Sequence, residues 1–275
     1  MAALDLSDKN NFRTYFKQRL PSSSRHRRRL ILGVGLAVTV LILPSSLLGG
    51  AKLTTPQVLQ ASFEEQESIL NKYNIAKAEL ETKRQGLAQV YRQAKQENER
   101  QEILKQAAAL LKTYLEARLI PAWFGTPYDF NGCAQAPQTG SIACGVFITT
   151  VLKDAGFNVE RIALGIRPAE EIIKTLVEEK YIYRFSYKSG AEFLSLLKSY
   201  PQGIYLLGLD THIGFLLNDE EGCFFIHASR LSSLGVIREE AREAYSLINS
   251  SYRVMGLLTE SSQLLSKWLL GKEIP

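Results

Sequence analysis

The sequence predicts an α+β fold in which a helix that begins at a cysteine packs on an antiparallel sheet. Residues 57–120 lack proline and are rich in Glu, Gln, Lys, Ala and Leu, a composition typical of helix. Cys144 follows turn-forming residues, and apolar residues then recur at helical spacing until Gly156. Four apolar runs are typical of strands, namely 203–209, 212–218, 223–228 and 252–258.

Residues 1–29 form a basic leader that we expect to be cytoplasmic. They carry eight Lys and Arg residues against two Asp, a net charge of +6 in a chain whose formal net charge is +5. The rest of the chain is therefore close to neutral, and the positive charge is confined to one block beside an apolar run. This distribution argues against a nucleic-acid-binding surface, so we expect no nucleic-acid partner.

The apolar run over residues 30–51 predicts a transmembrane anchor or signal segment. No charged residue lies between Arg29 and Lys52, and about twenty residues are enough to cross a hydrocarbon layer of ~30 Å. Because basic flanks stay in the cytoplasm, we expect a single-pass protein of the cell membrane whose later residues lie on the extracytoplasmic side, periplasmic or outer. The alternatives are a cleaved signal segment, with Gly49 and Ala51 as the small residues before the cut, which would release a secreted protein, and a buried core helix.

Residues 55–119 are expected to form a helical stalk with coiled-coil-like spacing. One series of apolar residues recurs every seven positions, at Tyr73, Leu80, Leu87 and Ala94. A second series, which begins at Phe63, is interrupted by charges. We therefore predict a stalk capable of self-association, and a packed helix over 103–119, where the apolar face is denser. The alternative for the whole region is one or two helices packed on the following domain.

Residues 120–275 are expected to form a catalytic domain. Unpaired N–H groups and the helix dipole favour a thiolate at a helix start, so we expect a lowered pKa for Cys144. Two of the three histidines, His212 and His227, lie in runs that the polar turn 218–222 joins. Alternate residues of a hairpin share a face, so the two rings can lie side by side.

The end of the chain is expected to be mainly helical. Helices are predicted over 237–249 and 260–271, and Thr259 or Ser261 is the expected N-cap of the second.

A cysteine and two histidines supply the groups that nucleophilic catalysis needs. A thiolate attacks a carbonyl, one imidazole accepts and returns the proton, and a further polar group holds that imidazole in place. Each signal alone is weak, because a single cysteine or strand histidine is more often a core residue. The order of the three residues therefore carries more information than any one of them.

This order resembles the NlpC/P60 family of papain-like cysteine peptidases and amidases. In the family a cysteine opens a helix, a strand reading His-Val/Ile-Gly-Ile/Phe follows, and a hairpin ends in a second polar residue. Cys144 matches the nucleophile, His212 the general base and His227 the residue that orients the base. Tyr128 matches a tyrosine that lines the site, and Gly145 stands where the family usually has a substrate-contacting serine. The resemblance covers about residues 120–260 and implies a papain-like fold.

The resemblance implies a thiol-dependent hydrolase that cleaves an amide bond in peptidoglycan stem peptides, with substrate contacts from Tyr128 and Gly145. No cofactor or metal is expected. Two alternatives remain open: a membrane-anchored envelope scaffold or binding protein whose papain-like domain does not cleave, and a thiol acyltransferase.

The chain has three cysteines, and a free Cys144 leaves Cys133 and Cys223 as the pair available for a disulfide. Spacing does not decide whether this bridge forms. A zinc site is not expected, because neither CxxC nor HxxxH spacing occurs.

Overall fold

The structure, a computed structural model, describes residues 55–275, which belong to one compact unit. The predicted leader (1–29) and membrane segment (30–51) lie outside the described residues. Among helices of the described part, none combines the length and apolar character that crossing a bilayer requires.

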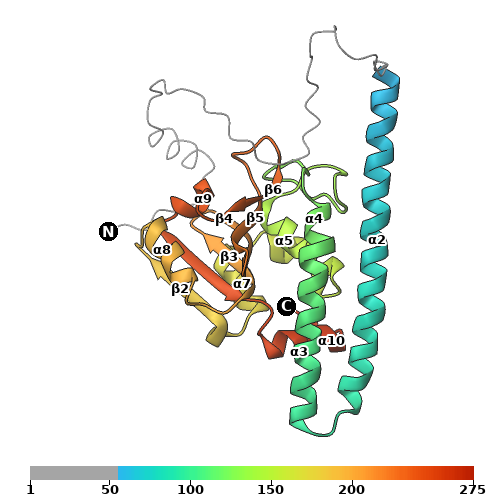
Figure 1. The fold of residues 1–275 in the computed structure, drawn as a ribbon, viewed down its shortest axis with the longest axis vertical. Coiled ribbons are helices and arrows are strands. Elements are labelled where there is room, and N and C mark those ends of the chain that lie inside the picture. Colours follow the sequence, from blue (N-terminus) through green and yellow to red (C-terminus); the bar gives the residue numbers. More distant parts are fainter. Residues whose placement is uncertain (1–54) are drawn as a thin grey trace. The chain divides into compact units, whose positions relative to one another are not determined.

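The fold is α+β, as the sequence predicts, and contains a six-stranded antiparallel sheet in the order β2-β7-β3-β4-β5-β6 (Figure 1). The strands of this sheet are β2 (Ile182–Ser186), β3 (Gly203–Leu209), β4 (His212–Asp219), β5 (Gly222–Ala228), β6 (Val236–Glu240) and β7 (Tyr252–Leu257). The short strands β1 (Asn158–Val159) and β8 (Glu273–Ile274) form a separate parallel pair. The helices are α2 (Thr55–Gln93), α3 (Glu97–Tyr114), α4 (Ile120–Ala122), α5 (Cys144–Asp154), α6 (Arg161–Gly165), α7 (Ala169–Leu176), α8 (Gly190–Leu197), α9 (Tyr245–Ile248) and α10 (Ser262–Leu270), with a π-helical turn η1 (Leu115–Leu119) and a 3-10 turn η2 (Glu179–Tyr181).

The four strands predicted from apolar runs are confirmed as β3, β4, β5 and β7. The helix predicted over 260–271 is confirmed as α10, and the Ser261 hydroxyl caps it by accepting from the N–H of Leu264 at 3.3 Å. The helix predicted over 237–249 is wrong, because these residues form most of strand β6 and the short helix α9. Pairing with β5 overrides the helix-favouring composition of this segment.

Helices cover both faces of the sheet, and alternate residues of each strand point to opposite faces. One face packs on α5 and α7, where the Phe147 ring meets Phe215 of β4 edge-on at 5.7 Å. The other face packs on α8 and α9 through Phe193 and Leu247. The cysteine-bearing helix is thus held against strands β4 and β5, on which the two histidines lie.

The helical region is a hairpin, which corrects the expected single stalk. The chain turns after α2, and a capping box starts α3: the Glu99 carboxylate accepts the backbone N–H of Gln96 at 3.1 Å. Tyr73 and Leu80, two members of the seven-residue series, are buried. The series therefore serves packing within the chain. Self-association through this region stays a prediction.

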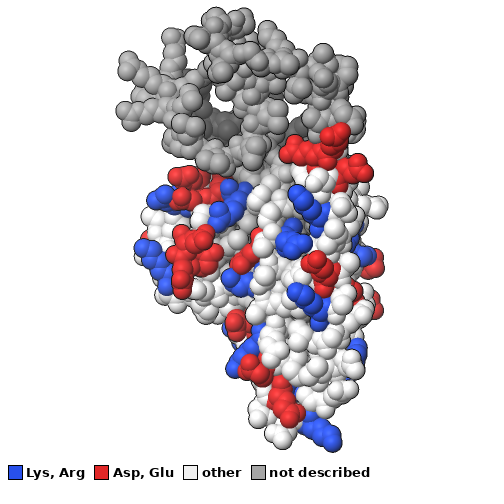
Figure 2. All heavy atoms as spheres, turned by 45° about the vertical axis from the view of Figure 1, so that its right-hand side comes forward, with Lys and Arg blue, Asp and Glu red and all other residues white. Residues whose placement is uncertain are grey.

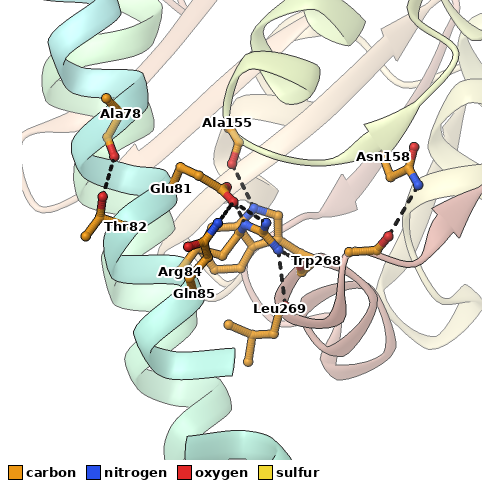
Figure 3. A network of polar contacts seen from close by, with 10 residues as sticks. Ala78, Glu81, Thr82, Arg84, Gln85, Ala155, Asn158, Trp268 and Leu269 are labelled. Carbon is orange, nitrogen blue, oxygen red and sulfur yellow. Dashed lines mark hydrogen bonds and ion pairs between the residues drawn. The ribbon is translucent and has the colours of Figure 1, made fainter. Parts of the chain in front are cut away.

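Helix α2 is tied to the last helix by a polar network (Figure 3). The Arg84 guanidinium donates to the carbonyls of Trp268 and Leu269 at 2.7 and 3.1 Å, where a cation complements the C-terminal dipole of α10. Glu81 accepts from Arg84 at 2.6 and 2.7 Å. The Trp268 indole in turn donates to the Ala155 carbonyl, just after α5, at 2.8 Å. The hairpin is therefore fastened beside the end of α5.

The outward face of the hairpin carries charges of both signs. Figure 2 shows Lys and Arg interspersed with Asp and Glu along this face. Mixed charge of this kind is typical of a solvated helix surface and gives no one-signed patch on the visible, described part of the face.

Candidate active site

Cys144 is the first residue of α5, as the sequence predicts. Ala143 precedes it in extended conformation (φ −80°, ψ 154°), and no side chain caps the helix. The first N–H groups of a helix have no helical acceptor, and those of Cys144 and Gly145 lie close to the Cys144 sulfur and favour its charged form. The partly buried thiol therefore lies at the positive end of α5.

The loop before Cys144 is held by backbone contacts. Ile142 forms bridges with both Tyr128 and Cys133. The Ala143 N–H donates to the Gly132 carbonyl at 2.9 Å, and a Cβ at Gly132 would lie 2.5 Å from the Ile142 nitrogen. Glycine is therefore required at 132 for the loop to deliver Cys144 to the start of the helix.

Gly145 is buried, although the resemblance implies that it contacts the substrate. A Cβ at this position would lie 2.1 Å from the Gly165 carbonyl oxygen, so glycine allows α5 and α6 to approach closely. Its N–H lies close to the Cys144 sulfur and favours the charged form of the thiol. The backbone is therefore the part of Gly145 that reaches the site.

His212 opens β4 and His227 lies near the end of β5. The structure brings the two together: His212 Nε2 lies 2.6 Å from His227 Nδ1, with the rings nearly perpendicular. The His227 ring also stacks on Phe225 at 4.4 Å and is almost fully buried. The pairing predicted from the hairpin is confirmed.

Glu239 of β6 is a site residue that the sequence did not reveal. Its Oε1 lies 2.8 Å from His227 Nε2. The register pairs Phe225 with Glu239 and His227 with Ile237, so the carboxylate and the buried ring share one face of the sheet. The sequence offered no period-two signal for this strand, because Val236 and Ile237 are followed by three charged residues, a composition that favours a helix.

Glu239, His227 and His212 form a line of hydrogen bonds. The Glu239 carboxylate at one end determines which nitrogen of each ring is protonated. An ionised carboxylate only accepts hydrogen bonds, so His227 Nε2 carries the proton and His227 Nδ1 is the acceptor. His212 Nε2 must then donate to His227 Nδ1. Assigned in this way, the tautomers leave His212 Nδ1 with a free lone pair, as a general base requires.

Cys144 lies next to this line without a hydrogen bond to the imidazole. The backbone N–H of Ile213, the residue after His212, lies close to the sulfur, whereas the described hydrogen bond of the His212 ring joins its Nε2 to His227. In apo structures, catalytic hydrogen bonds are often long and tighten only when substrate binds.

Burial favours the neutral forms of both the Cys144 thiol and the His212 imidazole. It raises the pKa of the Cys144 thiol above its usual value, although the N–H groups of Ile213, Gly145 and Cys144 and the charge of Arg230 oppose this. The lowered thiol pKa expected from the helix start is therefore wrong. Burial, followed by the nearby His227 and Arg230, lowers the pKa of His212 to about 3.

Tyr128 and Arg230 border the same site. Burial and the charge of Cys144 raise the pKa of Tyr128, while Arg230 lowers it. Tyr128 therefore lies near the thiol, as the resemblance implies. The sequence analysis did not single out Arg230, an exposed residue in the loop after β5, where the Ser229 hydroxyl accepts the N–H groups of Leu231 and Ser232 at 3.2 Å.

The disulfide between Cys133 and Cys223 does not form, and both cysteines are free. Cys223 pairs with Asn218, at the opposite end of the β4–β5 hairpin from His212, whereas Cys133 lies in the loop before α5. Within residues 55–275, no group of three His, Cys, Asp or Glu side chains is placed to hold a metal ion.

Comparison of the chain with protein-family models, with characterised proteins and with solved structures gives no match.

Proposed function

We propose that the chain is a thiol hydrolase that cleaves amide bonds, with Cys144 as nucleophile and His212 as general base on a papain-like scaffold. The observation that carries the proposal is the line from Glu239 through His227 to His212, which leaves His212 Nδ1 unprotonated. The backbone N–H of the next residue, Ile213, lies close to the Cys144 sulfur, which supports a single site for the base and the thiol.

Because thiol and imidazole are both neutral, the first step joins proton transfer to bond formation. The sulfur forms a bond to the amide carbon while its proton passes to His212 Nδ1. The carbonyl π electrons move to the oxygen of a tetrahedral intermediate. Collapse of that intermediate breaks the C–N bond, and His212 returns the proton to the leaving nitrogen, which gives an amine and a thioester. Water then attacks the thioester, with His212 again as base, and the thiol is regenerated.

The developing oxyanion needs donors that are already in position. The N–H groups of Cys144 and Gly145 lie at the uncapped start of the helix, close to the sulfur. Burial keeps the Tyr128 phenol protonated at neutral pH, so its hydroxyl is available as a further donor. These groups support the roles proposed for Tyr128 and Gly145.

We infer peptidoglycan stem peptides as the substrate from the motif that resembles NlpC/P60 proteins. The basic leader and the apolar run 30–51 support the same assignment, because they predict a protein held in the cytoplasmic membrane with its later residues outside the cytoplasm.

A non-cleaving binding protein or scaffold is the second candidate function. The pKa of Cys144 is raised, and its sulfur has no hydrogen bond to the His212 ring. Both observations describe a thiol that is not activated, as expected in a scaffold, which needs no nucleophile.

Incubation of the full chain with purified peptidoglycan, followed by mass analysis of released fragments, distinguishes the two functions. The hydrolase produces new amine and carboxylate ends within stem peptides, and Cys144→Ser, which is nearly isosteric, abolishes them. A chain that binds peptidoglycan, releases nothing, and whose binding is unchanged in Cys144→Ser is a scaffold.

A further inference from the structure

We propose that Glu239 is a positioning residue that sets the tautomers of both histidines and so decides which nitrogen of His212 can accept the Cys144 proton. This inference rests on the proposed function for its catalytic consequence, but the tautomers themselves can be measured without any substrate.

The buried position of His227 makes its hydrogen-bond partners decisive. Only 2% of the residue is exposed, and its two ring nitrogens face His212 Nε2 at 2.6 Å and Glu239 Oε1 at 2.8 Å. A buried imidazole whose nitrogens are both engaged by protein groups adopts the tautomer that those groups accept. Of the three groups, only Glu239 has an ionised form without a hydrogen-bond donor. It therefore determines which atom donates and which accepts in both hydrogen bonds of the line.

The neighbours of Glu239 on β6 are engaged elsewhere. Arg238 lies over the Phe224 ring at 3.5 Å, on the opposite face of the sheet. Glu240 pairs with Arg242 at 2.6 Å. The carboxylate that meets the buried histidine is therefore that of Glu239. Glu240 provides a matched control, because it carries the same charge on the same strand and faces the other way.

An amide at position 239 no longer determines which atoms donate and which accept in the line of hydrogen bonds. The Glu239→Gln side chain can donate as well as accept, so His227 Nε2 can become an acceptor and His227 Nδ1 a donor. His212 Nε2 would then accept, and the His212 proton would move to Nδ1. In that state His212 cannot take the proton of Cys144, although every heavy atom keeps its place.

The test uses the full-length chain labelled with ¹⁵N-histidine, whose imidazole shifts report which ring nitrogen is protonated. In the wild type we expect His212 and His227 both to be protonated at Nε2. In Glu239→Gln we expect a substantial Nδ1-protonated population of both rings, whereas Glu240→Gln keeps the wild-type pattern. His212→Gln and His227→Gln spectra assign the signals, and His26 is the third histidine of the chain.

The kinetic readout is the initial rate of peptidoglycan cleavage, measured beside the melting temperature. We expect Glu239→Gln to lose about 10²-fold at unchanged melting temperature, less than the roughly 10⁴-fold loss that follows when the direct partner of a catalytic histidine is exchanged. Glu240→Gln should retain the wild-type rate.

Two results would overturn the inference. One is an Nδ1-protonated His212 or His227 in the wild-type chain, which is measured without the Glu239→Gln variant. The other is an unchanged ¹⁵N pattern in Glu239→Gln. If the tautomers respond as expected but no variant or wild-type chain cleaves peptidoglycan, the assignment of Glu239 as tautomer setter stands and the proposed function fails.

Discussion

Replacement of His227 separates the orientation of His212 from the packing of the sheet. An asparagine at position 227 places its Oδ1 near the position of His227 Nδ1, so it can still accept the proton on His212 Nε2. An alanine cannot. Cleavage in His227→Asn should therefore stay within about tenfold of the wild type, whereas His227→Ala should lose about 10²- to 10⁴-fold because the His212 ring and its tautomer are no longer held.

The structure also gives the cost in stability. The His227 side chain is 3% exposed and stacks on Phe225 at 4.4 Å. Its removal leaves the donor on His212 unsatisfied, at about 1–3 kcal/mol, and loses an aromatic contact of about 1 kcal/mol. Glu239 is partly exposed, so water can replace the lost donor there. We expect His227→Ala to lower the unfolding free energy by about 2–4 kcal/mol and His227→Asn by less.

The assay measures peptidoglycan cleavage and denaturant unfolding on the same preparations. A double-mutant cycle adds the decisive comparison: Glu239→Gln should have almost no further effect on the rate in the His227→Asn background, because the ring through which Glu239 acts is gone. Equal rates for His227→Ala and His227→Asn, or additive losses in the cycle, would refute the reasoning.

Other perturbations test single contacts. Iodoacetamide should alkylate Cys144 only at a pH higher than the pH at which an ordinary cysteine reacts, because the pKa of its thiol is raised. Arg230→Gln should shift this alkylation to still higher pH, because the Arg230 charge lowers the thiol pKa. Peptide mass mapping measures both effects. The cleavage rate should show no loss from His212 protonation between about pH 5 and 7, since the pKa of His212 is about 3; a pH–rate profile that fell with a midpoint near 6.5 would contradict this. Arg84→Ala should lower the unfolding free energy by about 1–3 kcal/mol through the loss of its bonds to Trp268 and Leu269, while the exposed Arg92→Ala should have little effect, as denaturant unfolding can show. Gly145→Ala should disturb the packing of α5 on α6 and reduce both stability and cleavage, because its Cβ would lie 2.1 Å from the Gly165 oxygen; thermal unfolding measures the first effect.

The sequence was sufficient where local pattern and final structure agree. The strands β3, β4, β5 and β7 are predominantly apolar runs, and a polar turn separates β4 from β5. The apolar pattern and the turn residues were therefore enough to place the two histidines on one hairpin. Their contact at 2.6 Å follows from that placement.

The sequence was insufficient where tertiary pairing decides. Arg238, Glu239 and Glu240 have the composition of a helix, and only pairing with β5 makes them a strand. The seven-residue series through Tyr73 and Leu80 was compatible with a partner helix from either the same or another chain, and the turn before α3 selects the same chain. Position at a helix start predicted an activated thiol, but burial outweighs the helix N–H groups and raises the pKa of Cys144.

The contacts of the helical hairpin also bear on what constitutes the working unit. Asp154, the last residue of α5, accepts from the Tyr73 hydroxyl at 2.7 Å and pairs with Lys77 at 2.6 Å. The Trp123 indole, which is fully buried, donates to the same hydroxyl at 3.1 Å. A chain cut at residue 120 would expose Trp123 and leave Asp154 without both partners. The helix that presents Cys144 is therefore held at its far end by residues that composition alone assigned to a stalk, and the hairpin belongs to the structure that positions the thiol.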